Sequence, residues 1–268
     1  MVDSPNLDES AFCIPKLRRC PFDPATLSRD QRLQGGADGY VWRYVHVIEE
    51  PILTSLPVQF YDTGPPELDA YYAAQRECQN AALLQMMVAA VADANGSREN
   101  PGPVLLINAH PKTAADALAN VYAFSNQGRS ERKQATGVAN LKLIKSLPRM
   151  RQCHGWMAID GQVFNELPMS LRPPSQVIGK LHRSFSPDQT YTAIVYEYVE
   201  EGENDPAAVE AVTSFLWLAG FSYGNSSLIQ NWKGAVLIDL SDIVHPLGFD
   251  WKITRYGPKT ANMVLRQW

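Results

Sequence analysis

The stretch that most constrains the fold runs from Asn231 to Ser241, with the sequence NWKGAVLIDLS. A Lys-Gly turn signal precedes four apolar residues, 235–238, which end at Asp239. An apolar run bounded in this way predicts a short buried strand with a carboxylate at its end. The preceding segment, 223–231, is rich in amide and hydroxyl side chains. These features together predict a polar site where the strand ends.

The chain has 268 residues, a formal net charge of −4 and a pI near 5.8. This mild acidity gives no overall electrostatic attraction to nucleic acid. No apolar run approaches the roughly 20 residues that span a bilayer. The polar, acidic first ten residues do not resemble a signal peptide or a transit peptide. We therefore expect a cytoplasmic or nuclear protein without a membrane partner.

Potential metal ligands are scattered along the chain. The cysteines form no C-x-x-C pair, and the histidines occur singly. Nucleophile-elbow, zincin and Walker motifs are absent. We predict no metal site, and the sequence leaves the cofactor unknown. The residues concerned are Cys13, Cys20, Cys78, Cys153, His46, His110, His154, His182 and His245.

A glycine-rich segment at 33–42, LQGGADGYVW, predicts a hairpin with Gly36 and Gly39 beside the turn. Glycine allows the backbone to turn sharply and to approach a phosphate closely. A hairpin without a ligand would use the same glycines, so both interpretations remain open. The strands expected next, 42–48 and 56–61, contain no lysine.

A long amphipathic helix is predicted from about residue 66 to residue 94. Glu77 lies within it, either as a carboxylate facing a cleft or as a surface or helix-stabilising charge paired with Arg76 or a neighbour. The following segment, 96–150, reads as a helical, basic insertion. It is interpreted either as a solvated insertion or as a surface for a polyanion or an acidic partner.

The segment 191–200 predicts an edge strand that leads into an acidic turn. Backbone groups from Glu197 to Val199 could then bond a planar ring. An Asp205-Pro206 pair predicts the start of the next helix. Only 27 residues follow Ser241.

Three sequence blocks resemble the protein-kinase-like superfamily, and most closely fungal kinase-like proteins of the Sim4-complex kinetochore subunit type. The blocks are LQGGADGYVW at 33–42, QRECQNAALLQMM at 75–87 and NWKGAVLIDLSD at 231–242.

This resemblance implies an α+β fold, namely a degenerate, minimal, two-lobed kinase-like fold with a truncated C-lobe. The implied parts are an N-terminal arm at 1–32, an N-lobe-like region at 33–199 containing the 96–150 insertion, and a reduced C-lobe at 200–268.

The resemblance also implies roles for the polar residues. Asp239 takes the metal-binding aspartate position, and either Gln230 or Asn231 takes that of the metal-binding asparagine. Asn225 falls where the catalytic base would be, and a neutral amide accepts a proton poorly. The lysine that anchors the nucleotide is missing as well. Ordinary protein phosphorylation is therefore not expected.

Two functions of different class remain open. In the first, the chain is a transferase with a repurposed cleft that binds a small molecule or an aminoacyl-tRNA through the basic segment 129–151. Fungal cyclodipeptide formation is one example of such a reaction. In the second, the chain is a pseudokinase that binds a protein partner. For the transferase, the candidate catalytic residues are Asp239, Glu77 and Asn225, and the candidate substrate- or cofactor-binding residues are Gly36, Gly39, Ser226, Gln230, Asn231, Glu197 and Val199.

Overall fold

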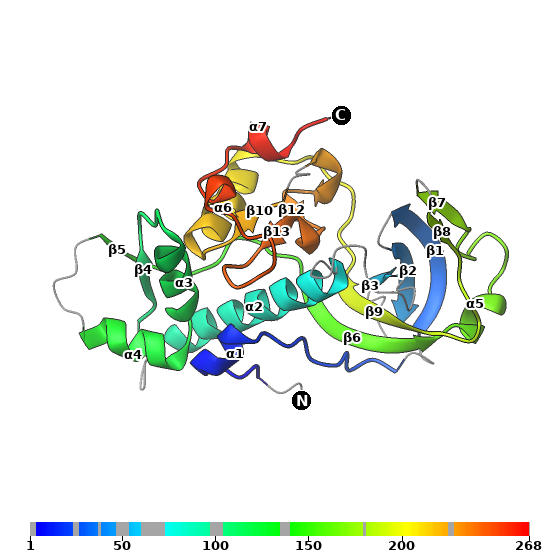
Figure 1. Ribbon diagram of the computed structural model, residues 1–268, viewed down its shortest axis with the longest axis horizontal. Coiled ribbons are helices and arrows are strands. Elements are labelled where there is room, and N and C mark those ends of the chain that lie inside the picture. Colours follow the sequence, from blue (N-terminus) through cyan, green and yellow to red (C-terminus); the bar gives the residue numbers. More distant parts are fainter. Residues whose placement is uncertain are drawn as a thin grey trace. The chain divides into compact units, whose positions relative to one another are not determined.

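The computed structural model is a mixed protein of helices and small antiparallel sheets (Figure 1). The expected α+β class is confirmed. No helix in the described part of the chain is long and apolar enough to cross a membrane. The structure describes residues 4–23, 27–36, 39–46, 54–59, 73–96, 104–134, 140–178, 181–224 and 228–267.

The chain divides into two compact units. Unit 1 contains Met1–Lys16, Gln75–Arg151 and Val199–Trp268, and unit 2 contains Leu17–Ala74 and Gln152–Tyr198. The last junction lies one residue before the boundary predicted at 199/200. The long helix and the 96–150 segment, however, group with unit 1 rather than with the sheet of unit 2.

Unit 2 is built on one five-stranded antiparallel sheet in the order β1-β2-β3-β9-β6. Gly36 pairs with Gly39 across the β1–β2 hairpin, which confirms the predicted glycine hairpin. Strand β9 lies between β3 and β6, so the predicted edge strand is an interior strand. The elements are β1 (Leu27–Gly36), β2 (Gly39–His46), β3 (Thr54–Gln59), β6 (Cys153–Asp160), α5 (Gln162–Asn165), β7 (Gln176–Ile178), β8 (Leu181–Arg183) and β9 (Thr190–Glu197).

Aromatic side chains fill the core of unit 2. Trp42 is fully buried, its ring lies 5.5 Å from that of Phe164, and its Nε1 donates a 2.9 Å hydrogen bond to the Leu171 carbonyl. Burial alternates along β6, as expected for a strand with one face on the core. Aromatic side chains bury a large apolar area each and therefore stabilise such a core strongly.

Unit 1 combines helices with two-stranded ribbons. The helices are α1 (Glu9–Cys13), α2 (Ala73–Ala94), α3 (Ala114–Tyr122), α4 (Asn126–Gln134), α6 (Pro206–Leu218) and α7 (Ala261–Val264). The ribbons pair β4 (Leu106–Asn108) with β5 (Leu141–Leu143), β10 (Ser222–Tyr223) with β13 (Ile243–Val244), and β11 (Trp232–Lys233) with β12 (Val236–Leu237).

Local signals explain where the helices begin. Asp205 caps α6 by accepting a 2.8 Å bond from the Ala208 amide, and Pro206 fills the first turn, as predicted. Thr113 and Asp116 form a reciprocal capping box on α3. Helix α2 is described from Ala73, so the expected start near residue 66 lies outside the described residues.

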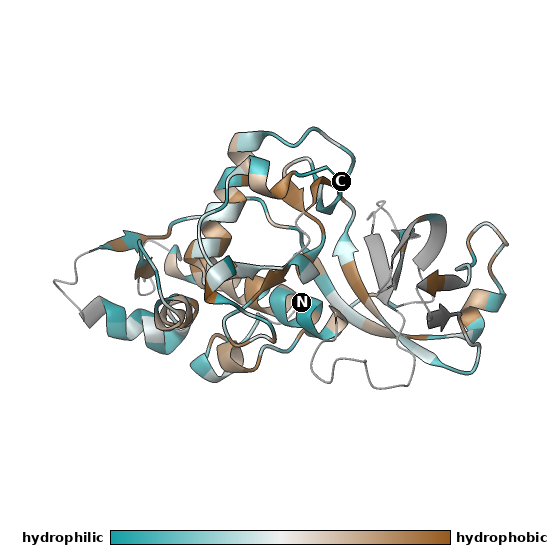
Figure 2. Ribbon diagram, turned by 45° about the horizontal axis from the view of Figure 1, so that its top comes forward, coloured by the Kyte–Doolittle hydropathy of each residue, from teal (hydrophilic) through white to brown (hydrophobic). Residues whose placement is uncertain are grey.

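The described parts of the 96–150 segment, residues 104–134 and 140–150, belong to unit 1 and contain buried side chains. Leu105 and Ile107 are fully buried around β4. Helix α4 is hydrophilic along its length (Figure 2), yet Arg129 on it is only 1% exposed. The interpretation as a solvated insertion was wrong for these residues because charged side chains in this segment bond to groups inside the unit.

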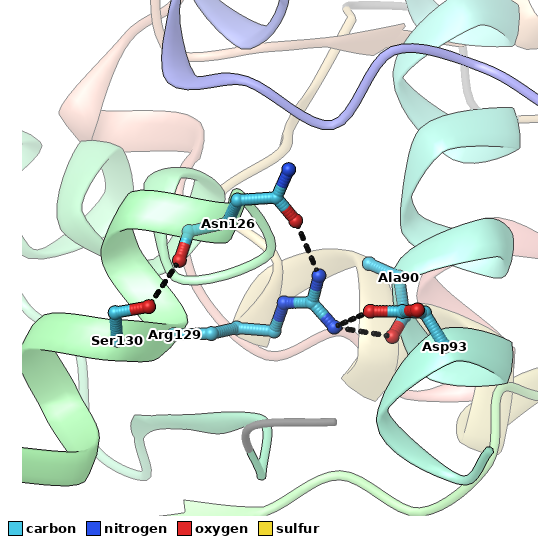
Figure 3. A network of polar contacts seen from close by, with 5 residues as sticks. All are labelled: Ala90, Asp93, Asn126, Arg129 and Ser130. Carbon is cyan, nitrogen blue, oxygen red and sulfur yellow. Dashed lines mark hydrogen bonds and ion pairs between the residues drawn. The ribbon is translucent and has the colours of Figure 1, made fainter. Parts of the chain in front are cut away.

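Figure 3 shows how Arg129 is held. One guanidinium nitrogen donates to the Asp93 carboxylate at 2.7 Å and to the Ala90 carbonyl at 3.3 Å, and the other donates to the Asn126 side chain at 2.7 Å. Charge-assisted bonds of this kind offset the cost of removing a guanidinium from water. The network joins the C-terminal end of α2 to α4.

Candidate functional site

The polar site lies in unit 1, where the β11–β12 hairpin ends. Gly234 and Ala235 both have positive φ, at 51° and 60°, which gives the tight two-residue turn of a hairpin. Asn204 supports the turn by accepting a 2.9 Å bond from the Ala235 amide. Val236 and Leu237 are buried. The predicted buried strand is confirmed, and it carries Asp239 just beyond its end.

Asp239 caps the 3-10 turn Leu240–Asp242. Its Oδ1 accepts bonds from the Ser241 amide at 2.9 Å and from the Ser241 hydroxyl at 2.7 Å. The side chain is half-buried. Asp239 therefore fixes the local backbone and contributes a negative charge to the site.

Asp242, at the end of this turn, is the buried carboxyl of the site. It is 7% exposed, and its Oδ2 accepts a 2.6 Å bond from Nδ2 of Asn231. Burial, followed by the repulsion of Asp239, raises its pKa to about 7, against the opposing effects of Asn231 and Arg76. Both protonation states are therefore populated at neutral pH.

Helix α2 provides one wall of the site. Arg76 donates to the carbonyls of Ser241 at 3.4 Å and Phe249 at 3.1 Å. Asn80 donates from Nδ2 to the carbonyls of Leu240 at 2.8 Å and Ile243 at 2.7 Å. Both residues lie on one face of α2, because positions four apart in a helix are neighbours. The segment that carries the carboxylates is thus bonded to one turn of this helix.

The pKa values of two further buried groups, His245 and Tyr223, are affected by the charges of the site. His245 lies 3.3 Å from the Gln79 side chain, and burial together with the Arg76 charge lowers its pKa to about 4. Burial, with a smaller effect of Asp242, raises the pKa of Tyr223. At neutral pH His245 is therefore uncharged and Tyr223 protonated.

Glu77 also lies on α2 and is 3% exposed. Its burial excludes a surface charge, whereas a helix-stabilising charge paired with a neighbour stays open. Neighbouring Cys78 has a pKa raised to about 12, first by burial and second by the charge of Glu77. The placement of Glu77 beside the Asp239 carboxylate remains a prediction.

The loop before the hairpin is described in part. Asn231 bonds to Asp242, whereas Gln230 is exposed on the 3-10 turn Ile229–Asn231. Of the two alternatives for the loop amide, Asn231 is therefore the one that contacts a carboxyl of the site. Asn225 and Ser226 lie outside the described residues.

The remaining candidate binding residues are divided between the units. Gly36, Gly39 and Glu197 belong to unit 2, and Val199 is the first residue of the last segment of unit 1. The Glu197 carboxylate accepts a bond from the backbone amide of Gln152. A site that includes these residues together with Asp239 stays a prediction.

Much of the basic segment 129–151 acts inside unit 1. Arg132 donates to the carbonyls of Leu106 at 2.8 Å and Ala119 at 2.9 Å, and Arg151 donates to the Ile238 carbonyl at 2.7 Å. Arg151 therefore supports the strand end that carries Asp239. The described basic side chains of this segment that are exposed are Lys142, Lys145 and Arg149.

Asp242, Asn80, Arg76 and His245 were not among the predicted site residues. A signal existed for the α2 residues, since Arg76, Gln79 and Asn80 are polar and lie at helical spacing on one face of the predicted helix. Among the described residues, no group of three or more His, Cys, Asp or Glu side chains is placed to hold a metal ion. The arrangement is suited to hydrogen bonding and to proton transfer near neutral pH.

Comparison with protein-family models, curated proteins and solved structures finds no match to this chain.

Proposed function

We propose that the chain is a degenerate kinase-like protein that acts as a transferase other than a conventional protein kinase, with Asp242 as its general acid and base. One observation carries the proposal: Asp242 is a buried carboxyl with a pKa of about 7, beside Asp239 and bonded to Asn231. A group whose pKa matches the working pH is suited to take up and return a proton during catalysis.

The order of elements along the chain supports the kinase-like part of the proposal. A glycine hairpin joins β1 to β2, the long helix α2 follows β3, and α6 leads through β10 to the β11–β12 hairpin. This is the order that the sequence resemblance implies. The sequence of β3, TSLPVQ, contains no lysine, which argues against conventional phosphotransfer.

The proposed chemistry uses the carboxyl in both protonation states. Deprotonated Asp242 accepts the proton of an acceptor hydroxyl or amine as that atom forms its bond to the transferred group. Protonated Asp242 then gives the proton to the leaving group, so the enzyme is unchanged after the cycle. Asn231 orients the carboxyl, and the charge of Asp239 strengthens it as a base.

The distribution of basic side chains favours a small-molecule substrate over an aminoacyl-tRNA. Arg129 is buried, and Arg132 and Arg151 bond to backbone carbonyls of unit 1, so of the basic side chains described in 129–151 only Lys142, Lys145 and Arg149 are exposed. Nucleic-acid affinity depends on exposed cations that reach phosphates. Fungal cyclodipeptide formation from aminoacyl-tRNA is therefore the less favoured form of the proposal.

A protein-binding pseudokinase is the second candidate function. Two observations favour it: both bonds to Asp239 are local capping bonds, and the side chains of Leu247, Phe249 and Ile253, which follow the site in sequence, are about half exposed. In this alternative the polar groups hold the turn, and an apolar surface binds the partner.

The ionisation of Asp242 distinguishes the two candidates. Its pKa is measured by ¹³C NMR of the side-chain carboxyl across pH 3 to 9, with Asp242→Asn for assignment. The transferase proposal expects a midpoint near 7. A midpoint close to the ordinary value of about 4 would remove its basis.

A thermal-shift screen follows with ATP and Mg²⁺, Mg²⁺ alone, tRNA and a panel of small hydroxyl and amine compounds. A ligand that binds the folded state raises the melting temperature. The transferase proposal expects a shift that Asp242→Asn weakens and that Glu131→Ala, a control at an exposed position on α4, retains. A shift unaffected by Asp242→Asn would locate binding elsewhere.

A further inference from the structure

Asn80 occupies an unusual position for an amide side chain. It is fully buried on helix α2, and its single NH₂ group serves two backbone carbonyls, those of Leu240 at 2.8 Å and Ile243 at 2.7 Å. These two residues flank Ser241 and Asp242. One side chain therefore bonds both ends of the turn that carries the buried carboxyl.

The orientation of this amide shows which of its groups the site requires. Two carbonyl oxygens can be bonded only by the nitrogen, so the Asn80 oxygen points away from them. Within the described part of the chain that oxygen has no hydrogen-bond partner. Buried polar atoms without a partner are rare in folded proteins. The Asn80 side chain therefore bonds both carbonyls of the turn, while its own carbonyl oxygen accepts no hydrogen bond from the described residues.

Other contacts hold the same turn from several sides. Arg76 donates to the Ser241 carbonyl, and the Gly224 amide donates to the Asp242 carbonyl at 2.6 Å. Arg76 on α2 and Asp239 on the same turn both affect the pKa of Asp242, and Asp242 in turn raises the pKa of Tyr223 on β10. Asn231 bonds the Asp242 carboxyl from the preceding loop. His245 lies beyond the turn and shares the influence of Arg76.

We infer that Asn80 is the positioning residue of this centre: its amide holds residues 240–243 on helix α2 and thereby sets the burial of the Asp242 carboxyl and its approach to Asn231. Asn80 acts through the backbone of the turn and takes no part in proton transfer. The functional meaning of this role rests on the acid and base role proposed for Asp242.

The test compares Asn80→Leu, which is similar in size but lacks the donor, with Gln79→Ala, which changes a contact to His245 on the same helical turn. Loss of the clamp admits water to the carboxyl, so the pKa of Asp242 in Asn80→Leu should fall by at least about one unit. Backbone amide exchange across 240–244 should accelerate at least about tenfold. Gln79→Ala should leave both quantities close to wild type.

A folded Asn80→Leu variant with unchanged Asp242 titration and unchanged exchange would overturn the inference. Should this variant fail to fold, the wild-type protein supplies the second measurement. The Asn80 side-chain amide protons should be protected from exchange, and their chemical shifts should change with the same midpoint as the Asp242 carboxyl. Rapid exchange, or shifts independent of that midpoint, would also overturn it.

The two proposals fail separately. An ordinary Asp242 pKa in the wild type contradicts the proposed function, whereas accelerated exchange in Asn80→Leu still establishes the positioning role. A raised wild-type pKa that is unaltered in Asn80→Leu, with unaltered exchange, contradicts only the positioning role.

Discussion

Nδ2 of Asn231 lies 2.6 Å from Oδ2 of Asp242, so the loop before the β11–β12 hairpin is bonded to the turn after it. The hairpin returns the chain on itself, and these two polar residues meet at its open end. The carboxyl in this bond is buried and has a pKa of about 7. Its ionisation therefore affects both the proposed chemistry and the stability of unit 1.

We predict that Asp242→Asn stabilises the protein above pH 7. Because the folded-state pKa of Asp242 is above that of the unfolded chain, the folded state binds the extra proton between about pH 4 and 7. The free energy of unfolding contributed by this group therefore falls as the pH rises through that window. An asparagine can still accept from Asn231 and carries no charge. Urea denaturation at pH 8 should show a gain on the order of a few kcal/mol, and a loss of stability there would contradict the raised pKa.

The second prediction concerns His245, whose titration changes the free energy of unfolding with pH in the opposite direction to that of Asp242. Its folded-state pKa of about 4 is below the value of about 6.5 in an unfolded chain. Its contribution to stability is therefore complete above pH 6.5 and is lost as the pH falls towards 4. His245→Gln should remove this loss.

Comparison of the single variants separates the two titrations. Between pH 4 and 6.5 the wild-type contributions oppose each other. Stability should therefore rise with pH across this range in Asp242→Asn and fall with pH in His245→Gln. Urea denaturation at pH 4.5, 5.5, 6.5 and 7.5 measures both slopes, and identical slopes in the two variants would refute the assignment.

The third prediction is that Arg129→Met destabilises unit 1 by about 2 kcal/mol. The Ala90 carbonyl and the Asn126 side chain lose their donor, while the half-exposed Asp93 carboxylate regains water. Chemical denaturation measures the change. Glu131→Ala, an exposed position on the same helix, serves as the control and should change stability by less than about 0.5 kcal/mol.

The fourth prediction tests the turn of the β11–β12 hairpin. A Cβ at Gly234 would meet no atom within 4 Å, so only its φ of +51° opposes a side chain. Gly234→Ala should therefore cost about 1 kcal/mol in denaturant unfolding. Gly234→Asn should cost less, because asparagine adopts this conformation more readily. Equal losses in the two variants would show that the backbone conformation is not the cause.

Local sequence patterns correctly predicted those elements that are determined by interactions between residues close together in the sequence. The turn and apolar run at 233–238 predicted the strand before Asp239, the glycines at 36 and 39 predicted a hairpin, and Asp205 with Pro206 predicted the start of α6. Each depends on the conformational preferences of a few neighbouring residues. The position of β9 inside its sheet was missed, because strand order depends on partners distant in sequence.

The sequence alone identified a polar centre near residues 231–242, but the contacts within it required the tertiary structure. Asp239 and Asp242 are both aspartates on one short turn, and nothing in their spacing reveals which is buried. Asn80, some 160 residues away, bonds the turn on either side of Asp242. Likewise, Arg129 lies in a segment whose sequence suggests a basic surface, yet its side chain is buried and pairs with Asp93 on α2. Desolvation and charge interactions depend on distance in space rather than along the chain, and for this reason the fold decides the ionisation of each group.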